Sequence, residues 1–294
     1  MCRARPPDLY PTFEDYRRCF VELVGGLPAE GLLVLCADDP EAVALQAHTS
    51  SPTATYGEAQ GAGWQVVPGK RTSPVTVDGV HGELQHFDVR SPDGENLPVA
   101  LTFPGAHSRL NATAALALAD HLGAPLSTCV SACSSFRGPA RRFQVLADID
   151  GISVVDDYGH HPTEVAVTVA TALERYPGRR LITVCIPHTY SRTRLFLDHY
   201  RRCFIGSDMV VLGPIEAARE RHLPATISSE DVAAEVRASP EETDEVHVVD
   251  SAEAAIDTVA PRARAGDVIL CISLGGFEGF AERLVAALPS RGHG

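Results

Sequence analysis

The stretch VVDDYGHHPTEV, residues 154–165, joins the end of an apolar run to the start of a helical pattern. Its first half predicts the end of a buried strand, and its second half predicts the beginning of a helix. Two aspartates, a tyrosine and two adjacent histidines lie between them. In an open α/β sheet, ligands bind beyond the carboxyl ends of the strands. The stretch therefore predicts an α/β unit with a functional site at this turn.

The chain after residue 151 alternates short apolar runs with amphipathic segments. Strands are predicted at 151–157, 180–188, 208–215, 245–250 and 267–275. Helices are predicted at 162–175, 191–204, 228–238, 251–263 and 277–288. This alternation favours right-handed β-α-β units and a parallel sheet. The fold class expected for this part is a doubly wound, Rossmann-like α/β domain.

The first part of the chain has a different pattern. Residues 32–45, LLVLCADDPEAVAL, predict a buried strand, a turn and a first helical turn that contains a proline. Short β-rich runs punctuated by Gly, Pro and Asp-Gly predict an antiparallel flap at 64–102. The segment 107–123 predicts a helix that ends at Gly123. We place the boundary near Phe136, which gives a partial α/β domain at 1–136 and a complete one at 137–294.

Composition limits the classes of function. The chain has 294 residues, of which 45% are hydrophobic and 21% charged, as in ordinary globular proteins. It has no run of about 20 apolar residues that predicts a membrane helix. An N-terminus without an apolar stretch predicts no secretory signal, so the cytoplasm is the expected location. A formal charge of -13 disfavours a general nucleic-acid binder. The eight scattered cysteines predict reduced thiols rather than a zinc site.

Three polar clusters follow predicted strands, at 156–161, at 187–194 (PHTYSRTR) and at 274–280 (LGGFEGF). Each cluster alone is also compatible with ordinary turn and capping chemistry. Two rich clusters after consecutive strands make a shared ligand site the better interpretation, because the carboxyl ends of parallel strands meet at one edge of the sheet.

Arg192 and Arg194 lie at the beginning of the helix predicted after the second cluster. A guanidinium matches a carboxylate bidentately, and the first amides of a helix also favour an anion. The pair predicts a clamp for an amino-acid or phosphate group, against the alternative of two solvated surface arginines. Two positions along a helix are about 200° apart. Only one arginine is therefore expected to face the site, and we favour Arg192.

Two further pairs of polar residues lie nearer the N-terminus. His107 and Asn111 are four residues apart, so they share one face of the predicted helix. Asn offers a donor and an acceptor that match an adenine edge, although a helix cap and a surface Asn explain the pair as well. Arg141 and Arg142, in GPARRF, lie at the predicted domain joint, where ligands between domains usually bind.

Five motifs resemble, in order and spacing, those of the Mur ligase family: FPGAHSRLNATAALALA, FRGPARRF, DDYGHHPTEV, PHTYSRT and AARE. The resemblance covers nearly the whole chain. Its wording is most similar to the branch of the family that joins L-alanine to UDP-N-acetylmuramate. It implies ATP-dependent peptide synthesis in peptidoglycan assembly, in which the muramyl carboxylate becomes an acyl phosphate that the amine of L-alanine attacks. Magnesium ions would neutralise the phosphates.

The resemblance also implies roles for single residues, and no metal ligand is among them. Those implied to contact the nucleotide are His107 and Asn111 at the adenine, Asp156 or Asp157 at the ribose, and Arg141 or Arg142. Those implied to border the acyl phosphate and the incoming amine are Tyr158, His160 and His161. Those implied to hold the alanine carboxylate are Arg192 and Arg194. We expect His107, Asn111, Arg141, Asp157, His160 and Arg192 to converge on one cleft between the domains.

The chain departs from the family in its phosphate-binding loop. The family's loop is glycine-rich and ends in Gly-Lys-Thr or Gly-Lys-Ser, whereas the Gly69-Lys70 pair is followed by Arg71. This pair lies in the β-rich stretch without a following helix, so it is not expected to bind phosphate. The family's UDP-sugar domain is not expected here either, and Pro6 stands where a magnesium-binding histidine is usual.

These departures lead to three hypotheses. The favoured one is an N-terminally truncated fragment of a peptidoglycan ligase, with a separate polypeptide supplying the rest. The alternatives are a degenerate, non-catalytic module that binds a nucleotide or an amino acid, and a ligase-like enzyme of another pathway. Under the favoured hypothesis the partners are ATP, L-alanine and UDP-N-acetylmuramate, and the isolated chain is expected to have little activity.

Overall fold

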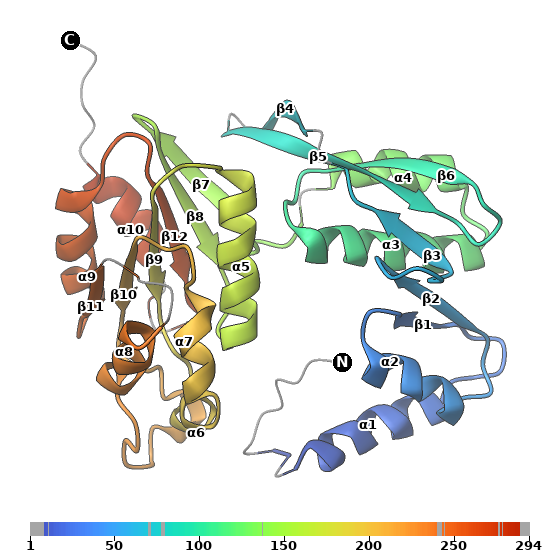
Figure 1. Ribbon diagram of the computed structural model, residues 1–294, viewed down its shortest axis with the longest axis horizontal. Coiled ribbons are helices and arrows are strands. Elements are labelled where there is room, and N and C mark those ends of the chain that lie inside the picture. Colours follow the sequence, from blue (N-terminus) through green and yellow to red (C-terminus); the bar gives the residue numbers. More distant parts are fainter. Residues whose placement is uncertain are drawn as a thin grey trace. The chain divides into compact units, whose positions relative to one another are not determined.

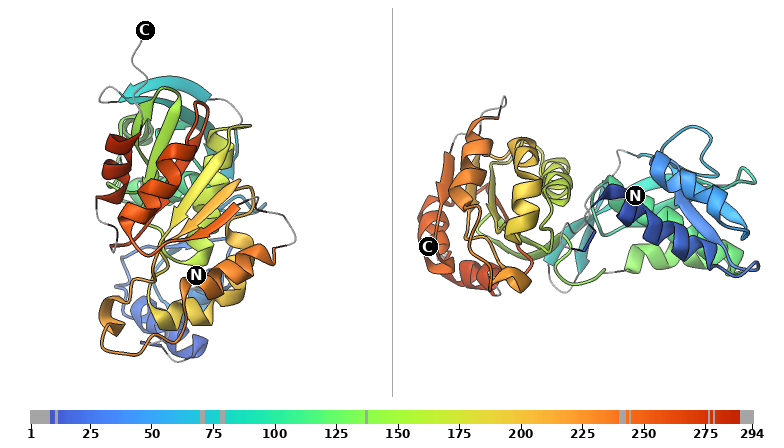
Figure 2. Two further views of the ribbon diagram at one scale, coloured as in Figure 1. Left: turned by 90° about the vertical axis from the view of Figure 1, so that its left-hand side faces the viewer. Right: turned by 90° about the horizontal axis from the view of Figure 1, so that it is seen from below.

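The structure of the chain is a computed structural model that describes residues 9–10, 12–69, 72–77, 80–136, 138–239, 243, 245–275, 277 and 279–288. The chain divides into two compact units, unit 1 (Met1–Gly138) and unit 2 (Pro139–Gly294) (Figures 1 and 2). The division lies two residues beyond Phe136, near which the sequence placed the boundary. Several residues discussed above lie outside the described residues, namely Cys2, Pro6, Lys70, Arg71, Arg137, Gly276 and Glu278.

Unit 2 is built on a six-stranded sheet in the order β11-β10-β9-β12-β8-β7. The five parallel strands of this sheet align in register, so that Val155, Leu270, Thr183, Val210 and Val246 form one row across it. The parallel sheet predicted from the sequence is confirmed. The strands of unit 2 are β7 (Gln144–Ile149), β8 (Ile152–Asp157), β9 (Leu181–Cys185), β10 (Met209–Leu212), β11 (Glu245–Val248) and β12 (Val268–Ile272).

The sequence did not predict β7. This strand pairs antiparallel with β8 at the edge of the sheet, with a bulge between Val145 and Ala147. Its residues are half-buried or exposed, so its sequence lacks the apolar run that marks the central strands. The sheet of unit 2 is therefore mixed, with one antiparallel edge strand.

Helices cover both faces of this sheet (Figures 1 and 2). On one face Val155 and Leu270 belong to a core cluster with residues of α5, α7 and α8. On the other face Val154 and Ile269 belong to a cluster with residues of α9 and α10. Both faces are buried because successive strand residues point in opposite directions. The helices are α5 (Pro162–Arg175), α6 (Tyr190–Leu195), α7 (Tyr200–Cys203), α8 (Ser229–Arg237), α9 (Ala252–Val259) and α10 (Phe280–Ala287).

The single helix predicted at 191–204 is wrong, because the structure interrupts it. A short 3-10 turn, Leu197–His199, separates α6 from α7. Phe196, just before this turn, has φ −112° and ψ 23°. Its ring packs edge-on against His161, with the ring centroids 4.4 Å apart. A tertiary contact at Phe196 therefore accompanies the departure from the local helical pattern.

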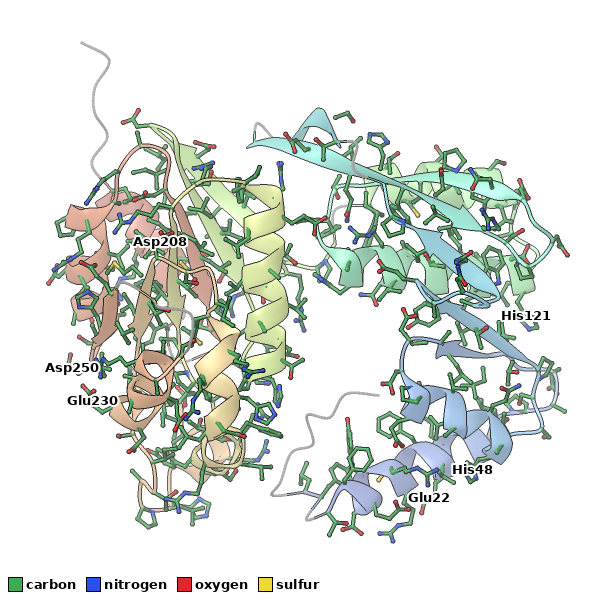
Figure 3. The ribbon with its side chains drawn as sticks, viewed as in Figure 1. Glu22, His48, His121, Asp208, Glu230 and Asp250 are labelled. Carbon is green, nitrogen blue, oxygen red and sulfur yellow. The ribbon has the colours of Figure 1, made fainter. Side chains whose placement is uncertain are left out.

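Arg179 ties together the amino ends of two neighbouring strands. Its guanidinium donates to the carbonyl oxygens of Gly151 (2.8 Å), Gly266 (2.8 Å) and Asp267 (2.6 Å). It also donates to Ser153 Oγ at 3.0 Å. These bonds join the residues that precede β8 to those that precede β12. Asp208, labelled in Figure 3, acts similarly before β10, because its carboxylate accepts the N–H of Leu181 at 2.7 Å.

We expect Arg179→Ala to lower the free energy of unfolding of unit 2 by about 2 kcal/mol, because hydrogen bonds from a charged donor exceed neutral ones. A lysine at this position is expected to restore little of the lost free energy of unfolding, since one ammonium cannot reproduce the planar set of donors of a guanidinium. Urea unfolding followed by circular dichroism measures the change. The control is Arg202→Ala, which removes an exposed arginine of α7. Equal midpoints for the two variants would contradict the role of Arg179.

Unit 1 contains a second six-stranded sheet, in the order β1-β2-β3-β5-β4, with β6 beside β5. β1, β2 and β3 are parallel, whereas β3, β4 and β6 each pair antiparallel with β5. The antiparallel flap predicted at 64–102 is confirmed. The strands are β1 (Leu33–Cys36), β2 (Thr53–Gly57), β3 (Trp64–Val67), β4 (Thr72–Val77), β5 (Val80–Arg90) and β6 (Asn96–Leu101).

The main core of unit 1 lies between this sheet and two helices, α3 and α4. Trp64 and Phe87 of the sheet and Leu116 of α3 are buried there. A smaller cluster, with Val24 and Leu35 buried, joins α1 to β1. Gly123 adopts φ +74° one residue after the end cap of α3, as its predicted role requires. The helices are α1 (Phe13–Gly25), α2 (Pro40–Ala44), α3 (Ala106–His121) and α4 (Leu126–Ser135), and a 3-10 turn spans Leu45–His48.

Among the described residues, no helix combines the length and apolarity that crossing a membrane requires. The cysteines in the described ranges are all free thiols. Within the same ranges, no group of three or more His, Cys, Asp or Glu side chains is placed to hold a metal ion.

Candidate functional site

Asp157, the last residue of β8, builds the polar turn that follows this strand. Its Oδ1 accepts the N–H of Gly159 at 2.8 Å, and its Oδ2 accepts the N–H of Phe143 at 2.8 Å. The Thr168 hydroxyl of α5 adds a bond of 3.3 Å. A Cβ at Gly159 would lie 2.8 Å from Asp157 Oδ1, so the turn requires a glycine there. The buried carboxylate thus joins β8, the segment before β7 and α5.

Asp156 makes a different set of contacts, on the opposite side of β8. Its Oδ2 pairs with Arg141 Nε at 2.8 Å. Arg141 also donates to the carbonyl oxygens of Ser273 (2.6 Å) and Leu274 (3.3 Å). Burial raises the pKa of Asp156, and the Arg141 guanidinium works against this rise. Both groups are therefore held by partners within unit 2.

Arg142, the neighbour of Arg141, is exposed. Its guanidinium lies 5.5 Å from the centre of the Tyr158 ring, and the guanidinium of Arg141 lies 5.4 Å from the same ring. Contacts of this kind are attractive because the face of an aromatic ring carries negative charge. Both guanidinium groups thus lie near the Tyr158 ring, and the exposed Arg142 presents its positive charge to solvent beside the turn.

His161 is the N-cap of α5. Its Nδ1 accepts the N–H of Thr163 at 3.1 Å, and Glu164 accepts the backbone N–H groups of His160 and His161 at 3.1 and 3.2 Å. This is a capping box, which satisfies amides that a helix start leaves without partners. The His161 side chain is only 4% exposed, and burial lowers its pKa to about 4. His161 is thus a neutral ring with its proton on Nε2.

His160, by contrast, joins a cluster that spans the ends of β8 and β9. Its ring centroid lies 5.2 Å from that of His188 and 6.1 Å from that of Tyr158. Arg192 Nη1 lies 3.2 Å from His188 Nδ1. Burial is the main cause that lowers the pKa of His160, and it lowers that of His188 to about 4. We call His160, His188 and Arg192 the imidazole–arginine cluster.

The two arginines that follow β9 have different surroundings. Arg192 is half-buried in the imidazole–arginine cluster, whereas Arg194 is exposed and exerts its charge on Asp231 of α8. The helical spacing predicts that only one of them faces the site, and our choice of Arg192 stays a prediction. His188 was not singled out from the sequence, although it lies within the PHTYSRTR motif. The available signal was a histidine directly after a buried strand.

His107 and Asn111 lie on α3 in unit 1 and are both exposed. His107 Nε2 lies 3.3 Å from the hydroxyl of Ser108. The helix begins after Gly105, which has φ +93°. The two residues share this helix as predicted. Their convergence with Arg141, Asp157, His160 and Arg192, which belong to unit 2, stays a prediction.

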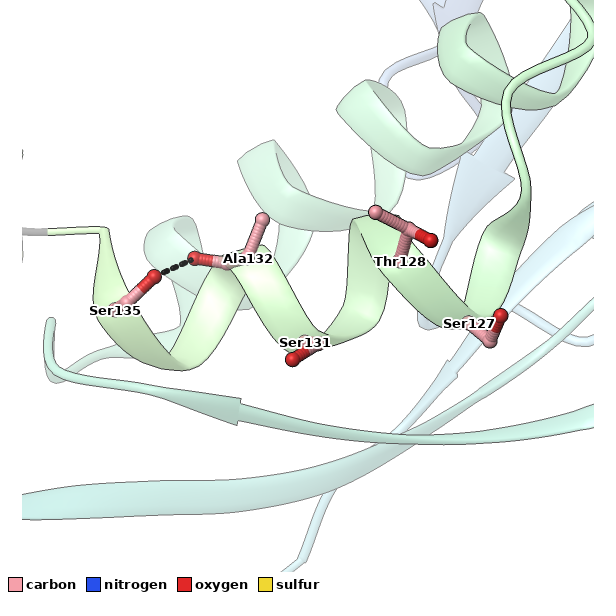
Figure 4. A pocket seen from close by; sticks show the side chains of 5 residues that line it. All are labelled: Ser127, Thr128, Ser131, Ala132 and Ser135. Atoms are coloured by element: carbon pink, nitrogen blue, oxygen red, sulfur yellow. Dashed lines mark hydrogen bonds between the residues drawn. The ribbon is translucent and has the colours of Figure 1, made fainter.

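The described residues line at least two hollows in the surface, one in each unit. One, of about 230 Å³, adjoins the Arg141–Asp156 pair in unit 2 and is also lined by Ser273, Phe277 and Glu282. The other, of about 450 Å³, runs along α4 in unit 1 (Figure 4). It is lined by small residues, and the Ser135 hydroxyl there donates to the helix's own carbonyl oxygen of Ala132. The first hollow adjoins candidate residues, and the second contains none.

Two family models match the chain. The Mur ligase middle domain matches residues 7–119, and the Mur ligase glutamate ligase domain matches residues 141–275. The UDP-N-acetylmuramate–L-alanine ligase of Halorhodospira halophila is 38% identical over 95% of this chain and 56% of its own length. The protein of the same name from Chloroflexus aggregans is 34% identical over 96% and 60%. The chain thus spans between half and two thirds of these relatives.

Solved structures share the fold. The UDP-N-acetylmuramate-alanine ligase of Thermotoga maritima has a TM-score of 0.72 at 21% identity, covering 97% of this chain and 57% of that one. MurF of Acinetobacter baumannii has a TM-score of 0.71 at 16% identity, covering 94% and 56%. Sequence models, relatives and fold agree over both units. The chain belongs to the Mur ligase family.

Proposed function

We propose that the chain takes part in the ATP-dependent joining of L-alanine to UDP-N-acetylmuramate during peptidoglycan synthesis. The observation that carries the proposal is the imidazole–arginine cluster beside the turn that Asp157 builds. The relatives that bear the name of this reaction support the choice of substrates. We place the reaction in the cytoplasm, which supplies ATP.

We assign Arg192 to the carboxylate of L-alanine. Its guanidinium can hold a carboxylate bidentately, and the neutral His188 beside it orients the guanidinium by accepting an N–H of Nη1 at 3.2 Å. His160 and Tyr158 would then border the reacting groups, since their rings lie next to this cluster. The ammonium of L-alanine must lose a proton before its amine can attack, and a neutral imidazole in this cluster can accept that proton. Arg194, which is exposed, contributes positive charge at longer range.

We assign Arg142 to the nucleotide, because it is exposed and Arg141 already makes four contacts within unit 2. His107 and Asn111 remain our candidates for the adenine. ATP would supply the phosphoryl group that activates the muramyl carboxylate. Magnesium does not fit the described residues by themselves, since they hold no group of three or more ligating side chains. No step is therefore assigned to a metal on this chain.

A separate polypeptide is part of the proposal. These 294 residues contain no Gly-Lys-Thr or Gly-Lys-Ser, and we propose that the phosphate-binding loop of the family acts on the site from outside them. The same feature favours the second candidate, a non-catalytic module that binds L-alanine or a nucleotide. The two candidates differ in whether a complementing chain restores turnover.

The test is a phosphate-release assay with ATP, magnesium, L-alanine and UDP-N-acetylmuramate. We expect no alanine-dependent release by the 294-residue chain alone, and release when the part of the Halorhodospira halophila ligase that it does not match is added. Arg192→Ala is expected to lower the restored rate about 10²-fold or more, as loss of a key electrostatic contact does. Arg202→Ala is the control.

Turnover by the chain alone would contradict the need for a second polypeptide. Absence of turnover in every combination, with L-alanine still bound in calorimetry and its binding lost in Arg192→Ala, would favour the non-catalytic module. Equal restored rates for Arg192→Ala and Arg202→Ala would refute the assignment of the alanine carboxylate to Arg192.

A further inference from the structure

Glu220 is a buried carboxylate that none of the assignments above uses. It ends the 3-10 turn Ala218–Glu220, within the AARE motif, and its side chain is 5% exposed. Its Oε2 accepts the backbone N–H of Ser191 at 3.0 Å, and its Oε1 accepts a hydrogen bond from the Ser191 hydroxyl. Both carboxylate oxygens of Glu220 thus bind one residue, Ser191, which is the second residue of α6.

The start of α6 lacks a cap of its own. The preceding residue, Thr189, makes no side-chain hydrogen bond to the helix. A carboxylate at a helix start satisfies an amide and is favoured by the helix dipole. Glu220 therefore does from a distant loop what an N-cap side chain does locally.

Glu216 binds the residues just before Ser191, and so holds the start of α6 at a second point. Its carbonyl oxygen accepts the N–H of Thr189 at 2.8 Å, and its N–H donates to the carbonyl oxygen of Pro187 at 2.8 Å. Its side chain accepts the N–H of Ala218 at 3.0 Å and an Arg221 N–H at 2.8 Å. Glu216 and Glu220 together hold residues 187–191 from one side.

The backbone between these two fastenings is strained. Thr189 has φ +61°, in the left-handed region that disfavours β-branched residues, and it is 1% exposed. Ala218, on the loop that holds it, has φ +47°. Such conformations persist only where surrounding contacts determine them, and they concentrate at functional sites. Glu216 and Glu220, which we together call the clamp, supply these contacts.

Two members of the imidazole–arginine cluster lie in or next to the strained segment. His188 lies directly before Thr189, and Arg192 directly after Ser191, and their side chains meet at 3.2 Å. The His188 ring in turn faces that of His160 across the two strand ends. Any movement of Ser191 would therefore move the first turn of α6 and with it Arg192.

We propose that Glu220 is a positioning residue, which caps α6 and so holds Arg192 and His188 in the orientation that receives the carboxylate of the amino-acid substrate. The identity of this ligand rests on the proposed function. The clamp itself rests only on the contacts within unit 2. Glu220 contacts no reacting atom under this proposal and acts through Ser191.

The clamp is tested without any ligand, by nuclear magnetic resonance of the chain with ¹⁵N-labelled histidine. In Glu220→Ala we expect the His188 and His160 ring signals to shift and the pKa of His188 to rise from about 4 toward 6.5 as the loop admits water. The groups that face His188 are His160, Arg192, Arg219 and Glu216. Glu220→Gln is expected to restore the wild-type signals, because its amide oxygen can still accept the Ser191 N–H.

The matched control is Glu230→Ala. Glu230 lies on α8 at the surface of unit 2, where it pairs with Arg237 at 3.4 Å (Figure 3). Its removal should leave the histidine signals in place. Unchanged His188 and His160 signals in Glu220→Ala would overturn the proposal. His188 and His160 signals that shift as much in Glu220→Gln as in Glu220→Ala would overturn it too.

The role in substrate binding is measured in the complemented ligase assay. Glu220→Ala should raise the KM for L-alanine at least about 10-fold with a smaller change in kcat, while Glu220→Gln stays within a few-fold of wild type. Shifted histidine signals with an unchanged KM for L-alanine would overturn the positioning role. If wild-type chain and partner give no turnover, the proposed function fails, and the clamp is still decided by the histidine signals.

Discussion

Unit 2 is expected to lose several kcal/mol of its free energy of unfolding between pH 6.5 and pH 4. The folded state holds His161 and His188 neutral, with pKa values of about 4 against an ordinary 6.5, chiefly because both rings are buried. Between these pH values the unfolded chain binds two protons, one on each histidine, that the folded chain does not bind. Stability is therefore complete above pH 6.5 and falls as the pH approaches 4, by about 3 kcal/mol for each histidine.

The charges around the two rings do not reverse this sign. Glu164 near His161 and Glu216 near His188 favour protonation, but each acts against burial, Arg192 and neighbouring histidines. The same two glutamates have lowered pKa values, so they add to the loss only at the acid end of the range. The histidines therefore dominate the upper part of the pH window.

Urea unfolding at several pH values measures the loss, followed by circular dichroism. The single tryptophan, Trp64, lies in the core of unit 1, so its fluorescence follows that unit separately. Asn is a good N-cap, so His161→Asn keeps the start of α5 while removing the titrating group. We expect His161→Asn and His188→Asn each to remove about half of the pH dependence. Parallel pH profiles for wild type and the double variant would instead assign the acid loss to carboxylates.

The sequence predicted the central strands and α5 well because local pattern and tertiary burial agree there. The run Ile152–Asp157 begins with the apolar, β-branched Ile152, Val154 and Val155 and becomes fully buried, and α5 begins and ends where the sequence placed it. β7 and the break at Phe196 were not predicted. β7 is an edge strand with a bulge, and the Phe196 ring packs against His161, which is 35 residues away in the chain. Contacts of this kind leave no local pattern.

Within the candidate site, the sequence located the polar turns but could not separate neighbours of the same type. Asp156 and Asp157 point to opposite sides of β8, so one meets Arg141 and the other Phe143. The guanidinium of Arg141 is occupied by the loop after β12, more than 130 residues later, and Arg142 is exposed. Only the folded chain distinguishes the members of such pairs.

Asp157→Ala is expected to lower the free energy of unfolding of unit 2 by about 4 kcal/mol. The carboxylate is buried and accepts hydrogen bonds from Phe143, Gly159 and Thr168. Hydrogen bonds to a charged group contribute about 1.5–3 kcal/mol each, and their loss leaves buried N–H groups unsatisfied. Phe143 also has φ +48°, a strained conformation that this bond helps to hold.

Two variants separate the structural role of Asp157 from the ribose contact that the family resemblance implies. Asp157→Asn keeps one acceptor but turns an amide donor toward the second N–H, so about half the loss is expected. Asp148→Ala, on the adjacent β7, removes an exposed carboxylate with one bond to Ser153 and should cost under about 1 kcal/mol. Urea midpoints and nucleotide binding are measured in parallel. A wild-type midpoint in Asp157→Ala, together with lost nucleotide binding, would show that this carboxylate serves the ligand. Both of its oxygens already accept hydrogen bonds within unit 2. We therefore expect the midpoint to fall and any loss of nucleotide binding to follow from the loss of stability.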